Sequence, residues 1–274
     1  LGSVSMKKTD FKVYPAHIAG VILIAAAAVT YFLAPVAAAG LLIIYVVLCI
    51  GACFFPGTNF LGPVISRGVT GQKKVALTFD DGPSEHTTMK ILELLDRHKM
   101  KAAFFVSGVN ARKHPGLILE IVRRGHEIGN HSMGHDPFLM LKSAKTIDRE
   151  VHQARLVLRA SGIEALAFRP PVGIINPKLP PILERRGLIC VTFSRRARDA
   201  GNRRVKNLSW RILKKVRGDD IILLHDTPVR QGQDQMQLWR EFEKIFIGLQ
   251  EAGLTTVSLA ELTGRQMMRP CSRR

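Results

Sequence analysis

Two histidines and two adjacent aspartates are the residues of this chain whose types and spacing could support hydrolytic chemistry. His131 and His135 stand four residues apart, and the pair Asp80-Asp81 lies fifty residues before them. Where the backbone winds helically, imidazoles at this spacing fall on one face and can bind one small cation. A carboxylate from elsewhere would complete three protein ligands and leave a fourth position for water, as hydrolytic metal sites do. The spacing therefore predicts a catalytic metal site.

Polar clusters recur after the strands that the sequence predicts. In parallel α/β folds, reactive groups gather at the carboxyl ends of the strands. Each cluster alone is typical of a turn. Their joint occurrence at one sheet edge favours a functional site, and the clusters are Thr78–Pro83, Asn130–Asp136, Phe168–Gly173, Arg198-Asp199 and Leu224–Asp226.

Short apolar runs alternate with amphipathic stretches from Lys73 onward, which indicates strands joined by crossover helices. The predicted strands are Val75–Phe79, Ala102–Val106, Glu127–Gly129, Ala165–Phe168, Leu188–Phe193, Ile221–Leu224 and Thr255–Leu259. The predicted helices are Thr87–Met100, Leu117–Arg124, Ala144–Ala160, Pro180–Arg186, Leu208–Val216 and Gln237–Ala252. About seven parallel strands with intervening helices predict an α/β fold, open or rolled into a barrel.

Five ordered motifs make the chain resemble the NodB-homology polysaccharide deacetylases. The motifs are Thr78–Gly82, His131–His135, Arg169–Gly173, the region of Asp199, and Ile222–His225, within residues 73 to 263. The resemblance implies a distorted (β/α) barrel that hydrolyses N-acetyl groups of amino sugars with a metal ion. Asp81, His131 and His135 would then hold a divalent cation, with Zn²⁺ favoured and Co²⁺, Mn²⁺ or Ni²⁺ as alternatives. Such an ion polarises the amide carbonyl and lowers the pKa of its water to about 7.

The same resemblance implies roles for four more residues. Asp80 would be the general base, and Arg169 would pair with Asp80 and keep it ionised. The backbone N–H of Val172 would help to hold the developing oxyanion. His225, as an imidazolium, would donate a proton to the departing amine.

The fourth motif departs from the family pattern. Family members usually carry a second aspartate followed by tryptophan there, whereas residues 194–201 read Ser-Arg-Arg-Ala-Arg-Asp-Ala-Gly without tryptophan. Asp199 is the candidate for orienting His225. The arginines beside the expected mouth of the site are either a solvated loop or a phosphate-binding rim, because guanidinium groups match phosphate oxygens. The tentative phosphate ligands are Arg195, Arg196 and Arg198.

An uncharged apolar run covers Ile18–Phe55, which is too long for one straight crossing of about 30 Å of hydrocarbon. Pro35 offers a break and predicts two transmembrane helices, with a re-entrant or interfacial hairpin as the alternative. Leu1–Met6 is expected to precede the natural start. The predicted organisation is a tail (1–17), two transmembrane helices (18–55), a linker (56–72), a NodB-like deacetylase domain (73–264) and a basic tail (265–274).

The charges predict the orientation and the partner. Lys7, Lys8 and Lys12 precede the apolar run and Arg67, Lys73 and Lys74 follow it, so the positive-inside rule places both ends in the cytoplasm. With 40 Lys+Arg against 22 Asp+Glu, the formal charge is +18, which implies an anionic partner. Only 7% aromatic residues and no zinc-finger spacing argue against nucleic acid. An anionic membrane surface is the expected partner.

Anchor, orientation and charge together predict a lipid-linked amino-sugar substrate. A cytoplasmic deacetylase tethered to a bacterial inner membrane cannot reach an external polymer, so its substrate is expected in the same leaflet. This architecture resembles the NaxD-like and ArnD-like subgroup, which deacetylates or deformylates undecaprenyl-phosphate amino sugars used to modify lipid A. N-acetyl is the family default, with N-formyl left open. The alternatives are an exported peptidoglycan or exopolysaccharide deacetylase and a non-catalytic sugar-binding protein on the same fold.

Overall fold

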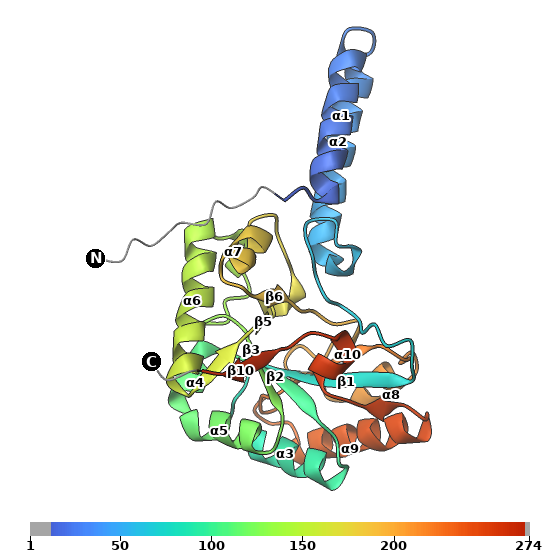
Figure 1. The fold of residues 1–274 in the computed structure, drawn as a ribbon. Helices are drawn as coiled ribbons and strands as arrows, with labels where there is room; N and C mark the ends of the chain where they lie inside the picture. The colour runs from blue at the N-terminus through green and yellow to red at the C-terminus, as the bar shows by residue number, and fades with distance from the viewer. Residues whose placement is uncertain (1–11, 272–274) are drawn as a thin grey trace, which may run out of the picture.

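The computed structural model describes residues 12–271, and it consists of an α/β domain with a helical rod projecting from it (Figure 1). Residues 1–6, expected to precede the natural start, lie outside the described residues, as does most of the predicted tail 1–17. The rod contains α1 (Pro15–Tyr31) and α2 (Pro35–Phe54), each with a proline at its first turn, where a missing N–H costs nothing. The Tyr45 hydroxyl donates to the carbonyl of Ala16 at 3.3 Å and ties the two helices together.

Only α2 among the described helices is both long enough and apolar enough to cross a membrane, judged by length and composition. The other helix of the rod, α1, is apolar but has 17 residues. A pair of membrane crossings therefore remains a prediction.

The domain is built on a curled, parallel half-barrel, which confirms the predicted parallel α/β class. The strand order is β6-β5-β3-β2-β1-β8-β7, and β9 pairs with β1 beside this path. These strands are β1 (Lys74–Asp80), β2 (Ala102–Val106), β3 (Glu127–Asn130), β5 (Ala167–Phe168), β6 (Ile189–Cys190), β7 (Arg195–Arg196), β8 (Ile221–His225) and β9 (Thr255–Thr256). The linker before β1 crosses the gap between the two ends of the sheet. It is held there by isolated bridges from Ile65 to Val191 and from Arg67 to Asp220.

Helices cover the outside of the half-barrel because their apolar faces pack on the sheet. They are α3 (Thr88–Arg97), α4 (Gly108–Lys113), α5 (Pro115–Arg123), α6 (Ala144–Ala160), α7 (Leu179–Arg185), α8 (Leu208–Leu213), α9 (Gln235–Glu251) and α10 (Leu259–Thr263). Short 3₁₀ turns η1 (Pro56–Thr58), η2 (Leu139–Leu141) and η3 (Pro171–Gly173) complete the connections. Phe79, Phe104 and Phe242 form the aromatic centre of the largest core cluster.

Two predicted segments differ from the structure. Arg195-Arg196, expected in a loop, forms β7, because its backbone pairs in parallel with Ile222 and Leu223 of β8. The predicted basic tail 265–274 contains β10 (Met268–Pro270), which pairs antiparallel with β4 (Ile163–Ala165). Residues 267–270 are held by this ladder and by the buried side chain of Met267, and no periodic apolar pattern in the sequence indicates either contact.

The rod is docked on the same side of the domain as the third motif. The backbone N–H of Ala16 donates to Phe60, and the N–H of Ile175 donates to Cys53 near the end of α2. Ala16 and Ala52 are buried in a core cluster together with residues of the domain. The end of α2 is therefore tied directly to the loop that follows η3.

Candidate active site

The sheet register brings the first and fifth motifs together. Asp80 ends β1, which lies between β2 and β8 in the sheet, and is aligned with His225 at the end of β8 and with Phe105 on β2. On the other side, Asn130 at the end of β3 is aligned with Phe168, directly before Arg169. Because all these strands are parallel, their terminal side chains meet at one edge of the half-barrel.

Asp81, His131 and His135 converge there as a possible metal-binding group. Their donor atoms lie within 4.8 Å of one another. The Nε2 atoms of His131 and His135 lie 3.4 and 2.9 Å from Oδ1 of Asp81. This carboxylate oxygen is buried yet receives no hydrogen bond from a described residue. One carboxylate oxygen and two imidazole nitrogens facing one another fit a divalent cation such as Zn²⁺.

The two histidines do not lie on a helix, contrary to the sequence expectation. After β3 the chain enters an irregular loop in which Ser132 and His135 have left-handed backbones, with φ of 65° and 52°. Asn130 accepts from the N–H of Ser132, and Glu150 accepts from the N–H of Gly134. These side chains hold the loop in a shape that converges the imidazoles without helical periodicity.

Two hydrogen bonds orient the donor set. Nδ1 of His131 lies 2.7 Å from the carbonyl oxygen of Arg169, so the N–H on Nδ1 donates there and Nε2 is left to bind a cation. Asn110, near the start of α4, donates from its side chain to the carbonyl of Asp81 at 2.7 Å. Asn110 was not identified from the sequence, because a single asparagine after Ser-Gly-Val reads as an ordinary helix start.

Asp80 and Arg169 form a buried ion pair beside the donor set. Nη1 of Arg169 donates to Oδ1 of Asp80 at 2.6 Å and to the hydroxyl of Thr78 at 2.8 Å. The same guanidinium donates to the carbonyls of Val191 and Thr192 and lies 3.9 Å from the centre of the Phe105 ring. Burial lowers the pKa of Arg169, and the neighbouring Asp80 carboxylate opposes that shift. The guanidinium therefore fixes the Asp80 carboxylate in place beside the donor set.

His225 and Asp199 form a second pair on the opposite wall. Nδ1 of His225 lies 2.7 Å from Oδ2 of Asp199. Burial alone would lower the pKa of His225, but the hydrogen bond and charge of Asp199 outweigh it and raise that pKa to about 9. Asp199 is itself held by the N–H of Asn202, whose side chain donates to the carbonyl of His225. An imidazolium kept charged at neutral pH can serve as a proton donor.

Val172 occupies a strained position on the rim. Its backbone is left-handed, with φ of 55° and ψ of 7°, an unusual conformation for a β-branched residue. The following Gly173 has φ of 73°, and a Cβ there would lie 2.9 Å from the Phe193 ring. Only glycine fits at position 173, which explains the Gly of the third motif. Strain of this kind is concentrated at functional sites.

One cleft of about 1150 Å³, here called the metal cleft, is lined by Asp80, Asp81, His131, His135, Val172, Asp199 and His225. Of the three arginines predicted to bind phosphate, Arg196 and Arg198 line it and Arg195 does not. The side chain of Arg195 instead lies 3.4 Å from the buried carboxylate of Asp220. Strand β7 causes this difference, because consecutive side chains of a strand point to opposite faces.

Asp226 belongs to the polar cluster Leu224–Asp226 predicted from the sequence, but it was assigned no role there. Both of its carboxylate oxygens accept hydroxyl hydrogen bonds at 2.6 Å, from Thr87 and Thr88. Its N–H donates to the carbonyl of Asp80 at 2.8 Å. Burial raises the pKa of Asp226 to about 6. Asp226 therefore braces the turn that presents Asp80 and Asp81.

The fold and the site together define a hydrolase. At the strand ends of a parallel half-barrel lie a metal-donor set, an aspartate paired with an arginine, and a histidine held by an aspartate.

The polysaccharide deacetylase family model matches residues 67–191. A peptidoglycan N-acetylglucosamine deacetylase of Bacillus cereus is 32% identical over 193 residues, which cover 70% of this chain and 88% of that protein. A chitooligosaccharide deacetylase of Sinorhizobium fredii is 36% identical over 164 residues, covering 59% of this chain and 76% of that protein.

Solved structures agree with the sequence comparisons. The crystal structure of a peptidoglycan N-acetylglucosamine deacetylase in complex with a substituted benzamide superposes with a TM-score of 0.68 at 28% identity. That match covers 75% of this chain and 95% of the other. The chain belongs to the polysaccharide deacetylase family, and its reaction class is the hydrolytic deacetylation of a carbohydrate.

Proposed function

We propose that this protein removes the N-acetyl group from an N-acetylhexosamine joined through phosphate to a polyprenol, at the cytoplasmic face of a bacterial inner membrane. The observation that carries the proposal is the docking of α2 beside the site. Its last turn is hydrogen-bonded through Cys53 to Ile175, three residues after Val172 of the metal cleft. A site fixed this close to an apolar helix suits a substrate that stays in the membrane.

The charge distribution supports the cytoplasmic orientation. Lys12 precedes the rod and Arg67, Lys73 and Lys74 follow it, whereas the helices α1 and α2 carry no charged residue. Both ends of the rod lie at the domain, and its turn lies at the far tip (Figure 1). Under the positive-inside rule, the domain then stays with the basic flanks. The product amine would be formed before the sugar is transferred onward, for example to lipid A.

The residues of the chain can perform the proton transfers of amide hydrolysis. Asp80, held by Arg169, accepts the proton of the attacking water. The backbone N–H of Val172 faces the oxyanion that develops on the amide carbonyl. His225, held as imidazolium by Asp199, gives its proton to the leaving amine. A divalent cation held by Asp81, His131 and His135 would polarise the carbonyl and acidify the water.

The test is deacetylation of two matched substrates by the purified, detergent-solubilised chain loaded with Zn²⁺. One substrate is a polyprenyl-phosphate N-acetylhexosamine, and the other is a neutral N-acetylglucosamine oligosaccharide. The proposal expects release of acetate, seen by mass spectrometry as loss of one acetyl group, chiefly from the lipid-linked sugar. The variant Asp80→Asn is the inactive control. Preferential turnover of the neutral oligosaccharide would reject the lipid-linked substrate.

A second function, deacetylation of peptidoglycan outside the membrane, is favoured by the names of relatives such as the Bacillus cereus enzyme. It requires the domain to lie on the outer side of the membrane, which the basic residues on either side of the rod disfavour under the positive-inside rule. A reporter fused after Arg274 discriminates the two, because alkaline phosphatase is active only outside and green fluorescent protein is fluorescent in the cytoplasm. Active alkaline phosphatase at that position would overturn the cytoplasmic placement.

A further inference from the structure

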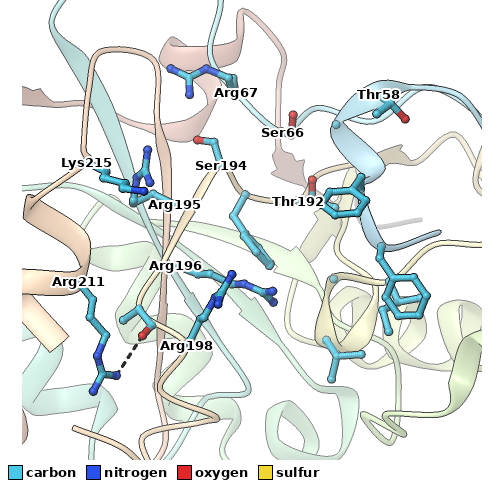
Figure 2. A pocket seen from close by; sticks show the side chains of 18 of the residues that line it. Thr58, Ser66, Arg67, Thr192, Ser194, Arg195, Arg196, Arg198, Arg211 and Lys215 are labelled. Carbon is cyan, nitrogen blue, oxygen red and sulfur yellow. Dashed lines mark hydrogen bonds between the residues drawn. The ribbon is translucent and has the colours of Figure 1, made fainter. Parts of the chain in front are cut away.

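A second cleft adjoins the metal cleft and is larger, at about 1200 Å³ (Figure 2). We call it the basic cleft, because no acidic residue lines it and all its charged residues are cationic. Four of them come from the linker and from the segment around β7: Arg67, Arg195, Arg196 and Arg198. Three more come from α8 and the turn after it: Arg211, Lys214 and Lys215.

Some of these cations already have partners. Arg67 and Arg195 share the buried carboxylate of Asp220, at 2.6 and 3.4 Å. Arg211 donates to main-chain carbonyls, and Lys214 lies 3.6 Å from the centre of the Trp210 ring. These side chains contribute to the positive potential of the cleft, but their contacts with the protein also fix the residues that line it.

The side chains of Arg196, Arg198 and Lys215 are exposed and make no ion pair or hydrogen bond within residues 12–271, and the Arg196 guanidinium lies 5.6 Å from the centre of the Phe193 ring. Figure 2 shows the guanidinium groups of Arg196 and Arg198 extending into the cleft. Arg198 has a left-handed backbone, with φ of 56°, which an ordinary surface arginine has no reason to adopt. Like charges held together without a counterion repel one another, so the arrangement favours an anion.

The position of the basic cleft defines which anion fits. It shares Val172, Gly173, Phe193, Arg196 and Arg198 with the metal cleft, so one ligand can occupy both. The basic cleft also reaches the last turn of α2, through Phe54. Phe55, which follows α2, and Trp210 of α8 line it as well and are 70% and 60% exposed. The basic cleft therefore combines cations with exposed apolar side chains and is continuous with the metal cleft.

We propose that the basic cleft binds the phosphate that links the amino sugar to its polyprenyl chain, with Arg196, Arg198 and Lys215 as its ligands. This inference rests on the proposed function and adds the subsite that recognises its substrate. Arginine forks and a lysine ammonium are suited to phosphate oxygens, and each charge-assisted bond is stronger than a neutral one. The sugar then extends over the shared wall to Asp80, and the first isoprene units lie against Phe55 and Trp210.

The test measures binding of farnesyl phosphate, a short polyprenyl phosphate without sugar, to the full detergent-solubilised chain by calorimetry. The double variant Arg198→Gln/Lys215→Gln is expected to raise the Kd at least tenfold. Arg240→Gln, which removes an exposed charge on α9 that lines neither cleft, is the matched control and should keep the wild-type Kd. Equal affinities of the double variant and the wild type would overturn the proposal.

Two further ligands identify the source of the phosphate. Farnesol, without phosphate, should bind at least tenfold more weakly than farnesyl phosphate. Inorganic phosphate should also bind at least tenfold more weakly, because it lacks the apolar chain. Inorganic phosphate binding as tightly as farnesyl phosphate would overturn the lipid-linked source.

Binding and turnover separate this inference from the proposed function. Farnesyl phosphate bound through Arg198 and Lys215, without deacetylation of any lipid-linked sugar, would keep the subsite and end the proposed function. Deacetylation of the lipid-linked sugar with unchanged kcat/KM in the double variant would keep the function and end the subsite.

Discussion

The metal cleft and the basic cleft share a wall but treat charge in opposite ways. At the metal cleft the groups assigned to the chemistry are buried or braced: Arg169 donates to four partners, and Asp199 holds His225. In the basic cleft the side chains of Arg198 and Lys215 are exposed and make no hydrogen bond or ion pair within the described chain. A buried charge without partners is costly, whereas an exposed one is solvated at little cost.

The difference in charge burial indicates separate roles for the two clefts, chemistry in the metal cleft and substrate recognition in the basic cleft. Chemistry requires groups that are fixed before the substrate arrives, and the metal cleft has them at the ends of β1, β3 and β8. Recognition of a flexible anion needs charge at the right place but tolerates mobile side chains, as in the basic cleft. Mutations should therefore act mainly on kcat and stability in the first cleft and on KM in the second.

The largest effect is expected from removal of a metal-binding group. His131→Ala should lose Zn²⁺ and reduce kcat below detection, because one of the three protein ligands of the ion disappears. Metal content by elemental analysis and acetate release check this in parallel. Lys215→Gln is the control that should retain one ion per chain. Full activity in a metal-free His131→Ala protein would refute a metal site at this position.

Replacing a buried arginine and an exposed arginine should separate the clefts by stability. Arg169→Met leaves Asp80 buried without its counterion and should destabilise the fold by about 3–5 kcal/mol, with kcat reduced as well. Arg196→Met removes an exposed side chain and should change stability by less than about 0.5 kcal/mol. Urea unfolding of both variants measures the contrast. Similar losses for the two would contradict the division between braced and exposed charge.

The pairing of His225 with Asp199 predicts a particular pH dependence. His225 acts in its charged form, so activity should hold until the pH rises through its pKa of about 9. Asp199→Asn removes the group that raises this pKa, and the alkaline limb should move toward about 6.5, with about tenfold lower kcat at pH 7.5. The folding free energy depends on pH with the same sign. The stabilisation by charged His225 is fully present below about pH 6.5 and is lost as the pH rises toward about 9. An alkaline limb unmoved by Asp199→Asn would assign the proton donation to another group.

Much of the metal cleft could be predicted from the sequence because its residues lie in short motifs at strand ends. The five polar clusters, the parallel sheet and the helix Ala144–Ala160 all follow from local pattern. The helical geometry expected for His131 and His135 is wrong, because left-handed residues converge them instead. Asp226 and Asn110 act on the turn through hydrogen bonds from segments distant in the sequence, and one sequence carries no sign of such contacts.

The basic cleft was harder to predict, for a physical reason. Its residues come from the linker, from β7 and from α8, which no local periodicity connects. The sequence placed Arg195, Arg196 and Arg198 together as one rim, but alternation along β7 sends Arg195 to Asp220. Arg67 joins the cleft because the linker pairs with Asp220 through an isolated bridge, and Lys215 joins it from the turn after α8.

The smallest effect is expected from a single exposed charge. Lys214 lies over Trp210 on the rim of the basic cleft, and such a charge contributes at most about 1 kcal/mol, or roughly fivefold in affinity. Lys214→Gln should therefore raise KM for the lipid-linked substrate by about two- to fivefold and leave kcat within twofold. Because exposed charges are screened over about 10 Å at 0.1 M salt, the difference from the wild type should shrink as salt is raised to 0.5 M. Initial rates at several salt concentrations measure this, with Arg240→Gln as the matched control. A change in kcat that persists at high salt would mean that the rim acts on the chemistry of the metal cleft, and the two clefts would then work as one site.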